Sequence, residues 1–188
     1  MKLLKAILKE LLIYCIIFVV TFIFFRFIFL ISTVMSGSME PTIMTGNTAL
    51  CNRLAYVFHE PERGDKIIFF SDEADTYYFK RIIGLPGDEI SFKDGHVLIN
   101  GVVLEEPYIA SNIRTECEKT FIVPKEHIFL LGDNRENSYD SRFWKEPFIS
   151  YDKITGKYMA QMDFSFEFDI RRKVVAWWKD WKLNKDIN

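Results

Sequence analysis

The longest apolar run of the chain lies near its N-terminus. Residues 11–25 carry no charged side chain, and beyond Arg26 the run continues to Ile31. A helix needs about 20 apolar residues to cross a bilayer, so the uncharged stretch must be extended on one flank. An arginine at the bilayer centre costs about 2.5–3.5 kcal/mol on insertion scales, so Arg26 is expected at the outer interface. The pattern predicts a single transmembrane anchor over residues 11–31.

Three lysines precede this run and predict its orientation. Lys2, Lys5 and Lys9 would hold residues 1–10 on the cytoplasmic side of the plasma membrane and place the rest of the chain outside. The alternative is a secretory signal that is cleaved off. A retained anchor is favoured, because the apolar run is long and is followed by Phe, Ile and Leu rather than by a small-x-small cleavage site.

After the anchor, the pattern predicts a mostly β domain over residues 32–160. Short runs of β-branched or aromatic residues alternate with turn sequences such as Pro86-Gly87-Asp88. The predicted strands are residues 67–70, 77–83, 89–92, 97–100, 121–123 and 128–131. Residues 111–120 are polar enough to form a loop.

In the last segment, residues 161–188, the spacing of apolar residues changes from every second residue, as in a strand, to the spacing of a helix. Phe164, Phe166 and Phe168 alternate with polar residues, which predicts a strand with one aromatic face. Trp177, Trp178 and the residues around them could then form an amphipathic helix whose other face is basic. Such a helix fits the membrane interface or packing against its own domain, and the sequence favours neither.

Composition narrows the classes of function. The net charge of −2 gives no reason to expect nucleic acid as a partner. Three cysteines are too few for a disulfide scaffold, and with Cys15 inside the apolar run only Cys51 and Cys117 could pair. The three histidines lack the spacing of metal ligands and lie near no apparent nucleophile. No metal and no cofactor are therefore expected, and a serine, histidine and aspartate triad is disfavoured.

Two motifs carry the candidate chemistry, a serine and a lysine. Ser38 lies in the run MSGSMEPT, residues 35–42, and Lys80 in the run YYFKRIIGLPGD, residues 77–88. A serine hydroxyl is a weak nucleophile, and a lysine can take its proton only if burial lowers the lysine pKa enough to leave the amine neutral. On an extended segment Tyr78, Lys80 and Ile82 share one face, which would bury the amine between aromatic and aliphatic neighbours.

With a third run, GDNRENSYDSR at residues 132–142, these motifs closely resemble the bacterial type I signal peptidases. The match extends from about Val34 to Lys157, and the short chain with one anchor is similar to the minimal Gram-positive form. The resemblance implies that Ser38 attacks the scissile carbonyl, that Lys80 is the general base and that Ser138 orients its amine. Ser36 and the backbone N–H of Ser38 would stabilise the oxyanion.

The resemblance also implies supporting roles. Asp133, Asp140 and Arg142, together with Arg81, are expected to form ion pairs that brace the site without exchanging protons. Ser138, Asp140 and Arg142 recur at a spacing of two, which would place them on one face if the segment were a strand. The residues that match the walls of the family's substrate pocket, which could equally be ordinary core residues, are Val34, Ile43, Tyr78 and Phe79.

The function implied is a membrane-bound serine endopeptidase that removes signal peptides from exported precursors. Its substrates would carry small residues at the first and third positions before the cut and pair with the strand that bears Lys80. One departure from the family is Lys145, where a glycine usually follows two aromatic residues. Two alternatives are a catalytically silent relative that assists exported proteins and a self-cleaving repressor. The first would lack Ser38 or Lys80, and the second would need a DNA-binding module in place of the anchor.

Overall fold

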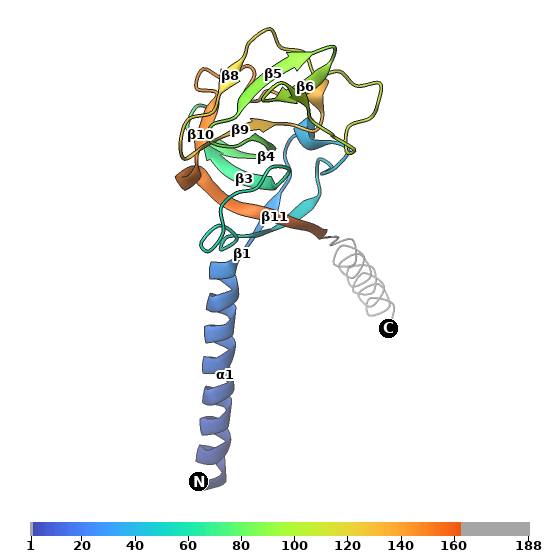
Figure 1. Cartoon of the computed structure of the whole chain (residues 1–188). Helices are drawn as coiled ribbons and strands as arrows, with labels where there is room; N and C mark the ends of the chain where they lie inside the picture. The colour runs from blue at the N-terminus through green and yellow to red at the C-terminus, as the bar shows by residue number, and fades with distance from the viewer. Residues whose placement is uncertain (1, 163–188) are drawn as a thin grey trace, which may run out of the picture.

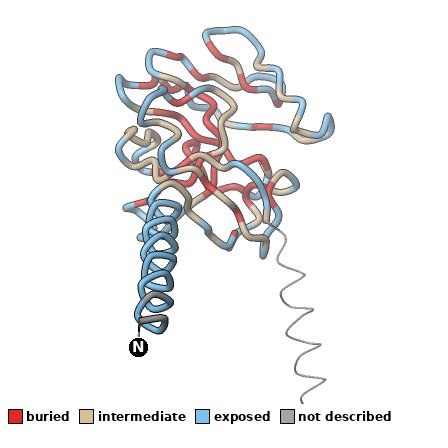
Figure 2. Tube along the Cα trace, turned by 90° about the horizontal axis from the view of Figure 1, so that it is seen from below, coloured by how far each residue is buried: buried red, intermediate tan, exposed pale blue. Residues whose placement is uncertain are grey.

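The computed structural model describes residues 2–162, in which one long helix leads into a β domain (Figure 1). The helix, α1, runs from Lys2 to Ile28, and its segment Ile7–Ile28 is long and apolar enough to cross a membrane. Its apolar side chains from Ile7 to Phe27 are exposed, and Figure 2 shows the helix in pale blue beside a domain whose interior is buried. The expected fold, mostly β with one N-terminal apolar helix, is confirmed. The predicted aromatic strand and amphipathic helix of residues 163–188 lie outside the described residues.

The C-terminal limit of the predicted anchor differs from the structure. The helix ends at Ile28, and Phe29–Thr33 forms strand β1, so the last three residues of the predicted 11–31 span belong to the β domain. β1 pairs antiparallel with β2, Thr48–Asn52, with Phe29 opposite Asn52. An apolar run alone does not show where a helix ends and a strand begins, because apolar residues suit both a membrane helix and a strand, and the pairing partner decides.

The β domain contains two sheets. The larger sheet has seven strands in the order β1-β2-β11-β3-β4-β9-β10. Its remaining strands are β3 Lys66–Ser71, β4 Thr76–Gly84, β9 His127–Leu131, β10 Phe148–Ser150 and β11 Ile154–Met162. The smaller sheet, in the order β7-β6-β5-β8, consists of β5 Glu89–Lys93, β6 His96–Ile99, β7 Val102–Val103 and β8 Phe121–Ile122. Three short 3₁₀ helices complete the described elements: η1 Gly37–Met39, η2 Arg135–Asn137 and η3 Tyr151–Lys153.

The six predicted strands are confirmed as β3, β4, β5, β6, β8 and β9, each within one residue at either end. The strands that the sequence did not predict lack strong alternation. β2 reads TALCN and β11 reads ITGKYMAQM, and both are held by pairing with strands far away in the chain. Their strand character depends on tertiary pairing rather than on local preference.

Strand β4 lies at the junction of the hydrophobic clusters. Phe79 packs into one cluster with Met39 and Ile68, whereas Ile82, on the opposite face of the strand, packs into another with Phe69 and Trp144. Ile83 joins a third cluster, which connects the large sheet to the small sheet through residues such as Ile90, Val97, Phe121 and Phe129. In Figure 1 the small sheet lies on the side of the large sheet away from α1. The middle of β4 is therefore held from several sides.

Candidate active site

Ser38 lies in the short helix η1, directly after the chain leaves β1. Its side chain is buried, and the Ser36 Oγ lies 3.4 Å from the Ser38 Oγ. The turn begins at Gly37, whose carbonyl accepts a hydrogen bond from the Glu40 backbone at 3.1 Å. The backbone of Ile43 donates to the carbonyl of Met39. These bonds hold the segment as one tight turn with the two serine hydroxyls together.

Lys80 stands in the middle of β4, opposite Ile67 of β3, and is only 2% exposed. Its Nζ donates a hydrogen bond to the Ser138 Oγ at 3.0 Å and lies 5.7 Å from the centre of the Tyr78 ring. Burial lowers the pKa of Lys80 to about 8, because the surroundings do not solvate an ammonium ion. The charges nearby act in both directions on this pKa: Asp140 and Asp133 raise it, and Arg142 lowers it.

Ser38 and Lys80 line the same cavity. A cavity of about 340 Å³ is lined by Ser36, Gly37, Ser38, Tyr78, Lys80, Asn134, Asn137 and Tyr139. The structure thus brings together a serine hydroxyl from η1, an amine from β4 and the polar loop that follows β9. Sequence reasoning had named four of these residues, Ser36, Ser38, Tyr78 and Lys80, as site residues.

Gly132 and Asn134 belong to the site but were not singled out from the sequence. A Cβ atom on Gly132 would lie 2.2 Å from the Ser138 Oγ and 2.4 Å from the Ser38 carbonyl oxygen, so only glycine fits there. The backbone of Asn134 donates to the Ser38 carbonyl at 3.0 Å, and its side-chain amide donates to the Gly37 carbonyl at 3.0 Å. The only sequence signal was their place inside the run GDNRENSYDSR.

The acidic and basic residues of that run form buried pairs. The Asp140 carboxylate accepts hydrogen bonds from the Arg142 Nε at 2.8 Å and from the Gly132 backbone at 3.1 Å. Asp133 accepts two hydrogen bonds from Arg81, at 2.8 and 2.6 Å. Both carboxylates are therefore occupied by fixed donors, which suits a bracing role more than proton transfer.

The segment that carries these residues is not the strand that the spacing of two suggested. Residues 138–140 are irregular and a turn follows, closed by hydrogen bonds from the backbones of Phe143 and Trp144 to the Asp140 carbonyl. Ser138, Asp140 and Arg142 are all buried, but so is Ser141, whose hydroxyl accepts a hydrogen bond from the Leu130 backbone. Side-chain hydrogen bonds to the end of β9 and to Gly132, rather than pairing as a strand in a sheet, hold this segment.

Comparison with known proteins identifies the family of the chain. The family described as "Signal peptidase, peptidase S26" matches residues 5–162. The chain belongs to that family. Among its relatives, the probable signal peptidase I-2 of Synechocystis sp. is 38% identical over 128 residues, which cover 65% of this chain and 57% of that protein. Signal peptidase IB of Staphylococcus aureus is 32% identical over 170 residues, which cover 81% of this chain and 87% of that protein.

A solved structure also resembles the chain. The crystal structure of a signal peptidase I from Enterococcus faecalis is 32% identical in sequence and has a TM-score of 0.47, and the match covers 53% of this chain and 97% of that chain. Some relatives are considerably longer: the chain spans just over half the length of the Synechocystis protein and of the signal peptidase I of Leptolyngbya laminosa, 57% in each case.

The residues expected to line the substrate pocket of this signal peptidase family member fall into two groups. Tyr78 lines the cavity beside Lys80. Val34, Ile43 and Phe79 pack together in one buried cluster, and Phe79 points to the opposite face of β4 from Lys80. In this structure those three residues have the surroundings of core residues, the alternative that the sequence had left open.

The arrangement of the His, Cys, Asp and Glu side chains in the described residues bears on metal binding and on disulfide formation. Within residues 2–162, no group of three or more His, Cys, Asp or Glu side chains is arranged to hold a metal ion. Cys51 is buried in the core and Cys117 is partly buried, and both are free thiols. Burial raises the pKa of the Cys51 thiol to about 12, so this side chain stays protonated and behaves as a small apolar residue.

Proposed function

We propose that this chain is a membrane-anchored serine endopeptidase that removes signal peptides from exported precursor proteins, with Ser38 as nucleophile and Lys80 as general base. The observation that carries the proposal is the Lys80 amine, which is buried, held by Ser138 and shares one small cavity with Ser38. Membership of the signal peptidase family supports the same reaction class.

The lowered pKa of Lys80 increases the fraction of its amine that is neutral, and so able to act as a base, at pH 7. An amine with a pKa of about 8 is roughly one-tenth neutral at pH 7, whereas an ordinary lysine is neutral in only about one molecule in three thousand. The larger neutral fraction comes from the burial of Lys80, which lowers the pKa of its amine. The bond to Ser138 fixes one direction of the amine and leaves its lone pair free to face another partner.

The reaction would proceed in two halves. The Ser38 Oγ attacks the carbonyl carbon of the scissile bond while the Lys80 amine takes the hydroxyl proton. Ser36, whose hydroxyl is next to that of Ser38, is suited to donate a hydrogen bond to the oxyanion, as is the Ser38 backbone N–H. When the peptide bond breaks, Lys80 returns the proton to the leaving amine of the mature protein. Water, deprotonated by Lys80, then attacks the ester carbonyl, and the bond to the Ser38 Oγ breaks as Lys80 returns the proton to that oxygen. This frees the signal peptide with a new carboxylate and restores the enzyme.

An unpaired edge of β4 is suited to bind the substrate. β3 pairs with β4 from Thr76 to Arg81, whereas β9 pairs with β4 only from Arg81 to Gly84. Within residues 2–162, the β9 side of Thr76–Lys80 therefore has no partner strand. An extended peptide could add there and present its scissile bond to Ser38.

The helix α1 is suited to anchor the enzyme in the plasma membrane. A cleaved signal sequence can also meet the length and composition expected of a membrane span, but α1 continues directly into β1, which is paired in the large sheet. If the helix is retained, α1 stays joined through β1 to the large sheet of the β domain. We propose that residues 1–10 are cytoplasmic, that the anchor ends at Ile28 and that the β domain lies outside the cell, near the surface where exported precursors emerge.

Incubation of the purified full-length protein in detergent micelles with an exported precursor tests this proposal. The precursor should be shortened to a product whose new N-terminus follows a residue with a small side chain. The Ser38→Ala variant should leave it intact, because loss of the nucleophile costs several orders of magnitude in rate. Cleavage by Ser38→Ala at the unchanged rate would remove Ser38 from the mechanism and, with it, the proposed function.

A further inference from the structure

A third buried ion pair connects the active-site loop to the small sheet. The Arg135 side chain, in η2, is completely buried. Its Nη1 donates to the Glu106 Oε2 at 2.9 Å and to the Thr115 Oγ1 at 2.7 Å, and its Nη2 donates to the other Glu106 oxygen. Glu106 and Thr115 belong to the long connection between β7 and β8 of the small sheet. Arg135 thus anchors the active-site loop to a different part of the fold.

The same guanidinium reaches the residue that separates the nucleophile from the orienting serine. The Arg135 Nε donates to the Gly132 carbonyl at 3.1 Å. Gly132 is in close contact with both the Ser138 hydroxyl and the Ser38 carbonyl, and no side chain could fit between them. A displacement of Gly132 would therefore move one or both of the groups that align Ser38 with Lys80.

Tyr108, on the same connection, extends the contact to the other side of Gly132. Its hydroxyl donates to the Glu106 Oε1 at 2.7 Å, and its ring lies 3.7 Å from the guanidinium carbon of Arg81. Arg81 in turn holds Asp133, the residue after Gly132, through two hydrogen bonds. The connection between β7 and β8 thus acts on Gly132 through Arg135 and on Asp133 through Arg81.

We propose that Glu106 is a positioning residue for catalysis: through Arg135 it fixes Gly132, and through Gly132 it keeps the Ser138 hydroxyl on the Lys80 amine and the Ser38 turn in place. The inference deepens the proposed function and rests on it. The charges that act directly on the pKa of Lys80 are those of Asp140, Arg142 and Asp133, and neither Glu106 nor Arg135 is among them. Glu106 therefore acts by placement rather than by its own field.

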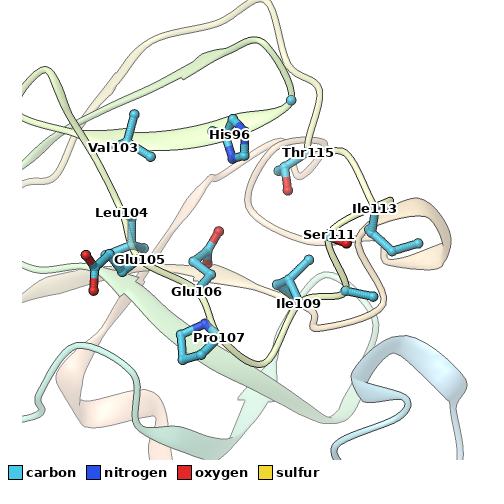
Figure 3. A pocket seen from close by; sticks show the side chains of 12 residues that line it. His96, Val103, Leu104, Glu105, Glu106, Pro107, Ile109, Ser111, Ile113 and Thr115 are labelled. Atoms are coloured by element: carbon cyan, nitrogen blue, oxygen red, sulfur yellow. The ribbon is translucent and has the colours of Figure 1, made fainter.

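The surroundings of Glu106 make the idea testable by truncation. Glu106 and Thr115 line a cavity of about 430 Å³, and Figure 3 shows both side chains at its wall. The side chain thus borders open space on one side, so removal of its carboxylate leaves no sealed cavity. It does leave the buried Arg135 guanidinium without its ion-pair partner, so the conservative Glu106→Gln variant is tested beside Glu106→Ala. Glu105, the neighbouring residue, is exposed and lines the same cavity, which makes it a matched control.

Steady-state kinetics of the full-length protein in detergent micelles, with a signal-peptide substrate, test the proposal. Glu106→Ala should lower kcat by about 100-fold with KM within about twofold, since a displacement near 1 Å costs this much in catalysis. Glu106→Gln, which keeps one acceptor oxygen, should retain an intermediate rate. Glu105→Ala should match the wild type. If Glu106→Ala retains the wild-type kcat, the proposal is overturned.

The pH profile separates positioning from simple loss of folded protein. When Gly132 and Ser138 loosen, water reaches the Lys80 amine, its desolvation decreases and its pKa rises towards the ordinary lysine value. In Glu106→Ala the rise of kcat/KM with pH should therefore move to higher pH. A uniform loss at every pH, with no such movement, would indicate a structural role only and would overturn the proposal.

A milder variant decides the matter if Glu106→Ala does not fold. Tyr108→Phe removes one hydroxyl and one hydrogen bond to Glu106 while it keeps the ring on Arg81. Tyr108→Phe should lower kcat about threefold to tenfold and shift the pH profile in the same direction as Glu106→Ala, by a smaller amount. If both Tyr108→Phe and Glu106→Gln keep the wild-type kcat, the proposal is contradicted. The wild type and Ser38→Ala are assayed in parallel as controls. An inactive wild type would contradict the proposed function itself. An active wild type, with the Glu106 and Tyr108 variants equally active, would contradict only the role of Glu106.

Discussion

The Nζ of Lys80 donates a hydrogen bond to the Ser138 Oγ at 3.0 Å, and both side chains are almost completely buried. A neutral lysine amine has two N–H donors and one lone pair. With one donor committed to Ser138 and the stem enclosed by β4 and its neighbours, the amine has few orientations left. Ser138 therefore restricts where the lone pair can point without itself reacting.

Removal of the Ser138 hydroxyl should affect catalysis more than substrate binding. In Ser138→Ala the amine is no longer oriented, and kcat should fall by about 10²-fold or more, the range of a general-base contribution, with KM nearly unchanged. Ser141→Ala is the matched control, because Ser141 is buried in the same segment and accepts a hydrogen bond from Leu130. It should cost about 1 kcal/mol of stability and leave kcat intact. A rise in KM alone for Ser138→Ala would make Ser138 a substrate contact.

Replacement of Lys80 by arginine should be as damaging as replacement by alanine. A guanidinium keeps its proton at any accessible pH, so Lys80→Arg preserves the positive charge but abolishes the base. Lys66→Arg is the control: Lys66 lies on the adjacent strand β3, and burial likewise lowers its pKa. Its activity should stay within about twofold of the wild type. Turnover by Lys80→Arg would mean that the charge, not the neutral amine, matters.

A single methyl group at Gly132 should disable the site. The added Cβ of Gly132→Ala would overlap the Ser138 Oγ and the Ser38 carbonyl oxygen, and the latter is backbone that cannot rotate away. We expect a loss of kcat of at least about 10²-fold and a destabilisation of about 1–3 kcal/mol. Gly101→Asn, at an open turn position with positive φ, should be tolerated. Wild-type turnover by Gly132→Ala would contradict the close packing of the two loops.

The proposed orientation predicts which part of the chain is accessible from outside the cell. Protease added to cells stripped of their wall should digest the β domain, which follows Ile28, and leave a membrane-embedded fragment that contains α1. A cytoplasmic marker protein should stay intact in the same cells. If the β domain is protected until detergent breaks the membrane, the orientation is reversed.

The sequence predicted the parts of the site that depend on local geometry. Alternation along β4 was sufficient to place Tyr78, Lys80 and Ile82 on one face, because a strand alternates its side chains whatever surrounds it. The apolar run was sufficient to predict a helix near the N-terminus. The end of that helix could not be predicted, since Phe29 and Leu30 suit a helix and a strand equally and only pairing with β2 makes them a strand.

The sequence could not predict contacts between distant segments. The Asn134 amide reaches the carbonyl of Gly37 across 97 positions, and Glu106 reaches Arg135 across 29. Nothing in either local pattern indicates these partners. The spacing of Ser138, Asp140 and Arg142 even suggested a strand, whereas the segment is irregular. Ser138 accepts a hydrogen bond from Lys80 of β4, Asp140 accepts one from the Gly132 backbone, and Arg142 donates one to the Arg135 carbonyl. Polar networks of this kind depend on which segments the assembled fold brings together, and the periodic spacing of residues in the sequence does not reveal them.

The pH dependence of kcat/KM tests the central claim, a neutral Lys80 amine as base, most directly. The substrate should be a peptide with blocked ends and no His or Cys, so that only the free enzyme titrates over the range measured. Because burial lowers the pKa of Lys80 to about 8, kcat/KM should rise about tenfold per pH unit on the acid side and level off above about pH 8. A profile that is flat from pH 6 to pH 10 would contradict a titrating lysine base.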